Sequence, residues 1–381
     1  MTVLKVKRLF DGEQWLNHQQ VTIENGKIQD ITPIDYPQLA TQLIDILAPG
    51  FIDVHVNGGG DVLFNHTPTL DALKVIVKNH AQFGTVAMMP TLISDDYDVM
   101  SQAHDAVCEA LQQGLAGIIG LHYEGPYLNP IRKGVHNEDK LRMPNEEKLF
   151  KILDVANHGK LMVTLAPEQV PDGFIEKLVK QHAIVCIGHS AATYDEAIRA
   201  VHCGARGFTH LFNAMTPLTS REPGVVGAAL QNQYKTWCGL IADGHHVHPA
   251  TMNIAMQAKG CEHIMLVTDA IQSVGSSKSE LPFLGQKIHR KNGKVTTADG
   301  TLAGSDLDMA SAVRNTIQLI KRTPQEAFQM ASLRPAQFLG LDHQLGRIKV
   351  GYQASLVALN QDYYVTQTWI DGHPMLEPKT H

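Results

Sequence analysis

Residues 184–190 read IVCIGHS and residues 207–215 read GFTHLFNAM, and in each segment a short apolar run ends at a histidine, His189 or His210. Short apolar runs bounded by turn residues are typical of strands that are buried on both faces. An imidazole at the end of such a strand has no favourable place in an apolar core unless it is paired. The two segments therefore predict neighbouring parallel strands whose ends carry a candidate site.

Three further apolar runs end at a residue that can bind a metal or carry a proton: GIIGLHYEGP (117–126) with Glu124, WCGLIADGHHV (237–247) with His246, and IMLVTDA (264–270) with Asp269. If the strands are parallel and close into a barrel, the five side chains meet on one rim. Barrel enzymes place their chemistry on that rim. A carboxylate, histidines and an aspartate gathered there indicate a metal-dependent hydrolase.

The whole chain has the alternation that a barrel requires. Eight apolar runs can be counted, at 48–56, 85–92, 117–123, 161–166, 184–188, 207–212, 237–242 and 264–268. Segments of helical period lie between or after them, for example at 69–83, 96–113, 193–204 and 306–322. This pattern predicts an α/β fold with a (β/α)8 TIM-type barrel. The alternative is a doubly wound open sheet, but GGGD at 58–61 lacks the spacing of its phosphate loop.

The two ends of the chain have a different pattern, with short strands, turn signals and no helices. Residues 3–32 contain the turn ENGK at 24–27, and residues 346–371 continue in the same style. We expect the termini (1–48 and 346–381) to form one small β-sandwich domain beside a catalytic barrel at 49–345. A further hairpin is expected at 287–304.

Composition limits the classes of partner. The net charge of −6 comes with no long run of one sign, which argues against nucleic acid and against an anionic membrane. The N-terminus lacks the apolar segment of a signal peptide, and no run reaches the roughly 18 apolar residues of a membrane span. Five cysteines without CxxC spacing are typical of reduced residues. These features predict a cytoplasmic protein.

The candidate metal ligands are Glu124, His189 and His210. Two imidazoles and one carboxylate, with an open position for water, suit a catalytic zinc ion. Iron, manganese, cobalt and nickel are also accepted by such a set. On the first strand, His55 is followed two residues later by Asn57, a poor ligand, so one tightly held ion is favoured and a weaker second ion near His55 stays open.

Other residues suit proton transfer and anion binding. Asp269 can take a proton from a metal-bound water and pass it to a leaving nitrogen. His246 can donate to a substrate carbonyl, and the planar fork of Arg221 suits phosphate. His122 shares the face of Glu124 as an inner-barrel residue. His66, His80, His104 and His158 are expected to be surface residues.

The joint pattern resembles the N-acetylglucosamine-6-phosphate deacetylases of the amidohydrolase superfamily. The resemblance covers nearly the whole chain, in order. Its segments are PGFIDVHVNGGG (49–60), GLHYEGPYLNPIRKGVHN (120–137), LAPE (165–168), GHSAAT (188–193), THLFNAM (209–215), REPGVVGAAL (221–230), ADGHHV (242–247), LVTDA (266–270) and LAGS (302–305).

The resemblance implies a role for each matching residue. Glu124, His189 and His210 would hold the metal, Asp269 would be the catalytic acid and base, and His246 would polarise the acetyl carbonyl. The implied substrate-binding residues are Val135, His136, Asn213, Ala214, Arg221, His246, Leu302, Ala303 and Gly304. In the family, the arginine that matches Arg221 comes from the neighbouring subunit of a homodimer.

The resulting expectation is metal-dependent hydrolysis of N-acetylglucosamine 6-phosphate to glucosamine 6-phosphate and acetate, in amino-sugar catabolism. The galactosamine epimer is the nearest alternative, since no side chain identified here would sense the one hydroxyl that differs. Another amidohydrolase acting on cyclic or N-acyl amides is more distant, because the fourth strand ends in LAPE (165–168) without the bridging lysine such enzymes commonly use. A non-catalytic sugar-phosphate binding protein would not need the full set of Glu124, His189, His210 and Asp269.

Overall fold

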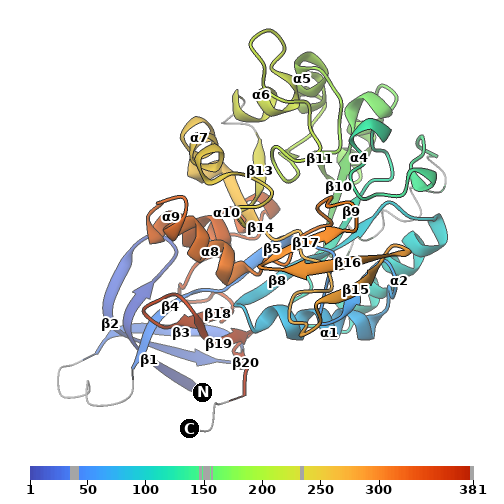
Figure 1. Ribbon diagram of the computed structural model, residues 1–381. Coiled ribbons are helices and arrows are strands. Elements are labelled where there is room, and N and C mark those ends of the chain that lie inside the picture. Colours follow the sequence, from blue (N-terminus) through green and yellow to red (C-terminus); the bar gives the residue numbers. More distant parts are fainter. Residues whose placement is uncertain (35–42, 146–147, 149–154, 156–157, 232–235, 378–381) are drawn as a thin grey trace.

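The computed structural model describes residues 1–34, 43–145, 148, 155, 158–231 and 236–377 (Figure 1). The stretches 35–42 and 378–381, which belong to the expected terminal domain, lie outside the described residues. No helix in the described ranges combines the length and the apolar character that crossing a membrane requires.

Eight parallel strands form the expected barrel. In spatial order they are β14 (Ile264–Val267), β13 (Trp237–Ile241), β12 (Gly207–Phe208), β11 (Ile184–Ile187), β10 (Lys160–Leu165), β9 (Gly120–Glu124), β8 (Thr85–Ile93) and β5 (Phe51–Val56). The ring closes where a parallel bridge pairs Val56 with Ala270, and the Asn57 N–H donates to the Ala270 carbonyl at 2.8 Å. Closure brings the carboxyl ends of all eight strands to one rim.

Helices surround the barrel (Figure 1). They are α1 (Leu70–Ala81), α2 (Tyr97–Gln112), α4 (Phe174–Lys180), α5 (Tyr194–His202), α6 (Gly224–Gln231), α7 (Pro249–Lys259), α8 (Met309–Gln318), α9 (Pro324–Ala331) and α10 (Leu333–Leu339). Short 3-10 turns lie at η2 (Pro130–Arg132), η3 (Glu138–Lys140), η5 (Pro167–Gln169) and η6 (Cys261–His263). The start of α5 shows why the sequence begins a helix there: Thr193 and Glu196 form a reciprocal capping box.

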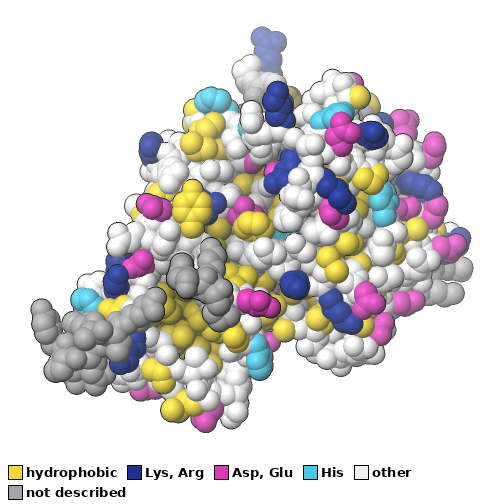
Figure 2. All heavy atoms as spheres, turned by 60° about the horizontal axis from the view of Figure 1, so that its bottom comes forward, with side chains coloured by type: hydrophobic (Ala, Val, Ile, Leu, Met, Phe, Trp, Pro, Cys, Tyr) yellow, Lys and Arg dark blue, Asp and Glu magenta, His cyan; other side chains and the backbone are white. Residues whose placement is uncertain are grey.

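Both termini build one seven-stranded sheet beside the barrel, at the lower left of Figure 1. Its order is β20 (His373–Pro374), β19 (Val365–Ile370), β18 (Leu356–Leu359), β4 (Ile44–Pro49), β1 (Thr2–Phe10), β2 (Trp15–Glu24) and β3 (Lys27–Pro33). The expected turn at 24–27 joins β2 to β3, and β4 pairs with strands from both ends of the chain. Figure 2, in which the bottom of Figure 1 comes forward, shows positive and negative side chains interspersed over the face that it draws.

One small hairpin and one three-stranded sheet cover the mouth of the barrel. The first is β6 (Gly58–Gly59) with β7 (Val62–Leu63), and the second is the three-stranded sheet β15 (Glu280–Phe283), β16 (Gln286–Lys291) and β17 (Lys294–Thr297). They meet in one apolar cluster formed by Leu63, Ile271, Leu281, Phe283, Ile288, Val295 and Ala303. The hairpin expected at 287–304 is therefore the second half of a larger insertion that packs over the rim.

The expectation that His80 is a surface residue is wrong. His80 is fully buried, and its Nε2 donates to the Gly58 carbonyl at 2.8 Å, which ties α1 to the β6–β7 hairpin. Burial lowers the pKa of His80 to about 4, so the ring is neutral. The sequence around it is amphipathic, and its polar neighbours gave no sign of this buried partner.

Candidate functional site

A cavity of about 170 Å³ opens at the carboxyl ends of the strands. Most of the predicted site residues line it: Glu124, Val135, His136, His189, His210, Asn213, Ala214, His246, Asp269, Leu302 and Gly304. Two predicted residues do not. Ala303 is buried in the apolar cluster under the hairpins, and Arg221 is exposed in the loop before α6.

Glu124, His189 and His210 bring three ligand-type atoms together. Glu124 Oε1 lies 3.1 Å from His189 Nε2 and 3.0 Å from His210 Nε2, and the two nitrogens are 2.9 Å apart. His189 Nδ1 donates to the Arg132 carbonyl at 2.7 Å, so the Nε2 of the neutral ring carries a lone pair. Burial raises the pKa of Glu124, but the neighbouring imidazoles, His55 first, bring it well below its ordinary value.

These three atoms fit a small divalent ion. Lone pairs that converge at about 3 Å need a cation between them, and zinc bonds of about 2.0–2.2 Å at tetrahedral angles separate ligands by a little over 3 Å. The remaining nitrogen of His210, Nδ1, is buried and has no partner within the described part of the chain. The donor set therefore suits zinc and also the other transition metals that imidazole and carboxylate accept.

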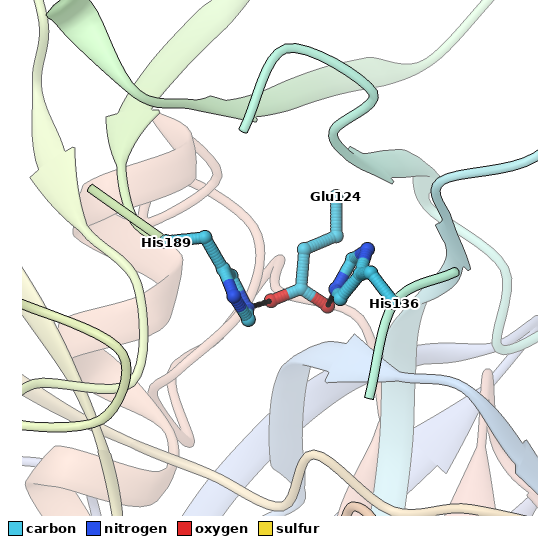
Figure 3. Close-up of side chains that lie close together, drawn as sticks. All are labelled: Glu124, His136 and His189. Carbon is cyan, nitrogen blue, oxygen red and sulfur yellow. Dashed lines mark hydrogen bonds and ion pairs between the residues drawn. The ribbon is translucent and has the colours of Figure 1, made fainter. Parts of the chain in front are cut away.

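His136 also faces Glu124, and Figure 3 shows the carboxylate lying between the rings of His136 and His189. His136 Nε2 is 3.9 Å from Glu124 Oε2. The backbone N–H of Ser94 donates to His136 Nδ1 at 3.3 Å, so the hydrogen of the neutral ring is on Nε2. Burial, together with repulsion from His189, holds the pKa of His136 well below its ordinary value. His136 is therefore a hydrogen-bond donor in the cavity, and His210 completes the lone-pair set.

Beside this set, His55 joins the two acidic residues of the site. Its Nε2 lies 3.1 Å from Glu124 Oε2 and 3.1 Å from Asp269 Oδ1. Burial lowers the pKa of His55, but Glu124 and Asp269 outweigh that effect and raise it to about 9. Asn57 donates from Nδ2 to the same Asp269 oxygen at 2.6 Å. The position of His55 on the first strand of the barrel thus connects the candidate metal ligand Glu124 to the candidate base Asp269.

The backbone at the site is strained. His189, His210 and Asp269 have φ values of +48°, +34° and +52°, a region that residues with a Cβ rarely adopt. Such positions cost on the order of 1–3 kcal/mol each and persist where surrounding contacts hold them. For Asp269 the contacts are backbone hydrogen bonds, from its N–H to the His55 carbonyl and from Ser305 to its own carbonyl. The strain turns each side chain from the strand end into the cavity.

The loop after β11 is held by Glu168, which follows β10. Its carboxylate accepts from Ser190 Oγ at 2.7 Å, from the Ala191 N–H at 2.6 Å and from Asn129 Nδ2 at 3.0 Å. The residue that ends LAPE is therefore used to position the loop that carries His189, and the end of the fourth strand supplies no lysine to a metal.

His246 is oriented by Asp243, a residue that the sequence analysis did not single out. Asp243 Oδ2 lies 2.6 Å from His246 Nδ1, and Oδ1 accepts the N–H groups of His245 and His246. Burial lowers the pKa of His246, but the Asp243 carboxylate outweighs it and raises the pKa above its ordinary value. The aspartate three residues before the histidine in ADGHHV was the available signal.

His122 lies below the cavity, inside the barrel. Its Nδ1 contacts Thr91 Oγ1 at 3.0 Å and its Nε2 contacts Thr164 Oγ1 at 2.7 Å. Burial, followed by the neighbouring His55, holds its pKa well below the ordinary value. It is a neutral residue that supports the floor of the site, as its alternation with Glu124 suggested.

Several cavity-lining residues were not predicted: Asn57, Leu63, Asn65, Ile93, Ile271 and Phe283. Ile93 could have been found, since it directly follows the second apolar run and pairs in register with Glu124. Phe283 could not, because it comes from the inserted hairpin, whose path over the rim depends on tertiary packing.

The chain matches a known protein family and is similar to named proteins over most of its length. The amidohydrolase family profile matches residues 46–375. The chain is 46% identical to N-acetylgalactosamine-6-phosphate deacetylase from Shewanella sp. (strain ANA-3) over 326 residues, covering 86% of this chain and 82% of the relative. It is 38% identical to the enzyme of that name from Escherichia coli O157:H7, covering 97% and 98%. It is 33% identical to N-acetylglucosamine-6-phosphate deacetylase from Vibrio furnissii, covering 99% and 95%.

Solved structures of proteins named as N-acetylglucosamine-6-phosphate deacetylases superpose on nearly the whole chain. N-acetylglucosamine-6-phosphate deacetylase from Pasteurella multocida superposes with a TM-score of 0.92 at 32% identity, covering 98% of this chain and 99% of that one. A mutant of the Mycobacterium smegmatis deacetylase, in complex with N-acetyl-D-glucosamine-6-phosphate, superposes with a TM-score of 0.91 at 28% identity, covering 99% of both chains. The chain therefore belongs to the amidohydrolase family.

Proposed function

We propose that this chain hydrolyses the acetamide of an N-acetylhexosamine 6-phosphate, releasing acetate and the amino-sugar phosphate. The observation that carries the proposal is the convergence of Glu124, His189 and His210 with Asp269 and His246 on one cavity at the barrel rim. Relatives that align with nearly the whole chain are named as deacetylases of such sugars.

We propose one divalent ion per chain, held by Glu124, His189 and His210, with zinc as the expected metal. When bound, it would lower the pKa of a coordinated water and polarise the substrate carbonyl. Iron, manganese, cobalt and nickel remain candidate ions, because the same ligand types accept them.

Asp269 and His246 have separate roles: Asp269 transfers a proton, and His246 stabilises the carbonyl oxygen. Asp269 takes one proton from the attacking water as the water oxygen bonds to the acetyl carbon. It then delivers this proton to the leaving nitrogen as the amide C–N bond breaks. His246 has its Nδ1 on Asp243, which leaves Nε2 for the carbonyl oxygen where negative charge develops. The second proton of the water also passes to the products, so amide and water become acetate and the protonated amine without any other reactant.

The sugar and its phosphate need a further set of contacts. We assign them to His136, Asn213, Ala214 and the backbone around Val135 and Leu302–Gly304, which line or border the cavity. Among the described lining residues there is no lysine or arginine, although a phosphate dianion needs a cationic partner. Arg221 is exposed on its own chain. We therefore propose a homodimer in which each Arg221 reaches the phosphate of the neighbouring site.

The glucosamine and galactosamine epimers are the two candidate substrates. The sequence pattern alone pointed to the glucosamine form. One finding favours the galactosamine form: the two highest identities among the reported relatives, 46% and 38%, are to proteins named for it. In either case we place the enzyme in the cytoplasm, in the breakdown or recycling of amino sugars. No disulfide joins its five cysteines, all of which lie in the described part of the chain.

The test is acetate release from both 6-phosphates and from unphosphorylated N-acetylglucosamine, before and after chelation and return of zinc. Metal-dependent turnover of a phosphorylated epimer, with little turnover of the free sugar, is expected. Metal-loaded protein that releases acetate from none of the three would overturn the proposed substrate class and direct the search to other N-acyl or cyclic amides.

A further inference from the structure

The carboxylate of Asp269 is held by one of its two oxygens. Asn57 Nδ2 lies 2.6 Å from Oδ1, and His55 Nε2 lies 3.1 Å from the same atom. Within the described part of the chain, every side-chain hydrogen bond and ion pair of Asp269 goes to Oδ1. The two partners are two residues apart at the end of β5, so their side chains leave the strand on the same face.

Hydrogen-bond chemistry decides which atoms donate. An ionised carboxylate only accepts, so the contact at 2.6 Å is a donation from the Asn57 amide. His55 Nε2 lies 3.1 Å from two carboxylate oxygens, Glu124 Oε2 and Asp269 Oδ1. The residue that follows β5 thus supplies a donor to the acidic residue Asp269.

The placement of Asn57 agrees with a role in the site. The residue is 4% exposed and lines the cavity, and its Oδ1 is buried without a hydrogen-bond partner in the described part of the chain. A buried acceptor left open is costly when the amide only fills space, since the group has lost its water. An apolar side chain of similar size would avoid that cost.

We infer that Asn57 is a positioning residue which, together with His55, fixes Oδ1 of Asp269 and leaves Oδ2 as the oxygen that takes and returns the proton. The inference rests on the proposed hydrolysis and deepens it. It assigns the asparagine of the first strand to the proton-transfer group rather than to a second metal site. With both contacts on Oδ1, the carboxylate cannot rotate to exchange its oxygens without breaking the Asn57 hydrogen bond and the His55 contact.

Two matched variants separate donation from space filling. Asn57→Leu removes the donor at similar volume, and Asn57→Asp keeps the shape but replaces the donor with an acceptor. We expect kcat to fall about ten- to a hundredfold in Asn57→Leu, the usual effect of losing a hydrogen bond to a charged group. Asn57→Asp should lose at least as much. KM and the metal content per chain should stay within about twofold of the natural protein.

The outcomes are decisive in each direction. A kcat near that of the natural protein in Asn57→Asp would show that shape alone is needed and would overturn the inference. Loss of metal in parallel with kcat in both variants would also overturn it, because the asparagine would then serve the metal site. Should Asn57→Leu fail to fold, Asn57→Ala replaces it under the same criteria. Failure of the proposed function itself would appear separately, as a natural protein inactive on either 6-phosphate.

Discussion

The Asp243 carboxylate fixes the ring of His246: Oδ2 lies 2.6 Å from Nδ1, while Oδ1 accepts the backbone N–H of His246 at 2.9 Å. With Nδ1–H given to Asp243, the other nitrogen carries a hydrogen only when the ring is positively charged. The raised pKa of His246 therefore extends the pH range in which it can donate to a substrate carbonyl.

Asp243→Asn should shift the alkaline limb of the kcat profile to lower pH. The change removes the negative charge that raises the pKa of His246, so the ring loses its second proton earlier as pH increases. The measurement is kcat against pH between about 5 and 9, with metal content recorded for each protein. An alkaline limb that stays in place would mean that His246 does not act as a charged donor.

Asp269→Asn should keep the metal and lose turnover. The substitution preserves the shape of the side chain but removes the group that accepts the proton, a contribution of about 10²–10⁴-fold. Steady-state kinetics and metal analysis of the same preparation give the result. Turnover within about tenfold of the natural protein would exclude Asp269 from the proton transfer.

Arg221→Ala should raise KM for the 6-phosphate and leave the slow reaction of the free N-acetyl sugar unchanged. The guanidinium pairs with phosphate in the proposed dimer, and the unphosphorylated sugar has no such group. An equal loss on both substrates would contradict a phosphate contact.

Mixing Arg221→Ala with Asp269→Asn tests whether the arginine acts in the neighbouring subunit. A mixed dimer restores one complete site, in which the Arg221→Ala chain supplies Asp269 and its partner supplies the arginine. We expect activity to reappear at low substrate concentration after the two proteins are unfolded and refolded together. Activity equal to the sum of the separate variants would place Arg221 in its own chain's site or outside the reaction.

Metal removal should lower both activity and the melting temperature. An ion that binds only the folded chain stabilises it by about 2.7 kcal/mol at a hundredfold excess over its Kd. Chelation should therefore shift Tm of the natural protein, and zinc should restore it. In His210→Ala, which lacks one proposed ligand, the shift should be much smaller. Equal shifts in the two proteins would show that the ion binds elsewhere.

The stability of the fold should fall in mild acid because of His80. Its pKa is about 4 in the folded chain and near 6.5 when unfolded, so the unfolded state binds more protons between those values. Stability is complete above about pH 6.5 and declines as pH falls toward 4, by about 2 kcal/mol at pH 5. His80→Gln, which keeps a donor for the Gly58 carbonyl, should reduce this dependence. Denaturant unfolding at about pH 7 and pH 5 gives the comparison, and equal pH dependence would contradict the assignment.

The barrel could be predicted from the sequence because each strand is an apolar run with a clear end. Strand lengths could not: the run at 207–212 gives a β12 of only Gly207–Phe208, since the backbone turns at His210 with φ of +34°. Local pattern records which residues are apolar, and it does not record a left-handed turn at a histidine. His80 and Phe283 depend on packing between distant segments, which periodicity does not encode.

The site residues also divide into those that a local sequence pattern predicts and those that depend on tertiary packing. Four site residues could be predicted from the sequence because they lie at strand ends, and parallel strand ends converge in a barrel. They are Glu124, His189, His210 and Asp269. The residues that orient these side chains were harder to predict from the sequence. Asp243 precedes its histidine within a loop, and Asn57 appeared only as a poor ligand until the structure placed it 2.6 Å from Asp269.

The seam of the barrel, where β14 meets β5, has a consequence for how activity arises during folding. Asp269 follows β14, the last strand of the ring, whereas the residues that contact its carboxylate, His55 and Asn57, lie at the end of β5, the first strand of the ring. The proposed metal ligands follow strands in between, so a partly assembled chain with an open ring could gather them without an oriented base. Hydrolysis would then begin only when the two ends of the sheet join, and the appearance of turnover in a refolding experiment would time that last step.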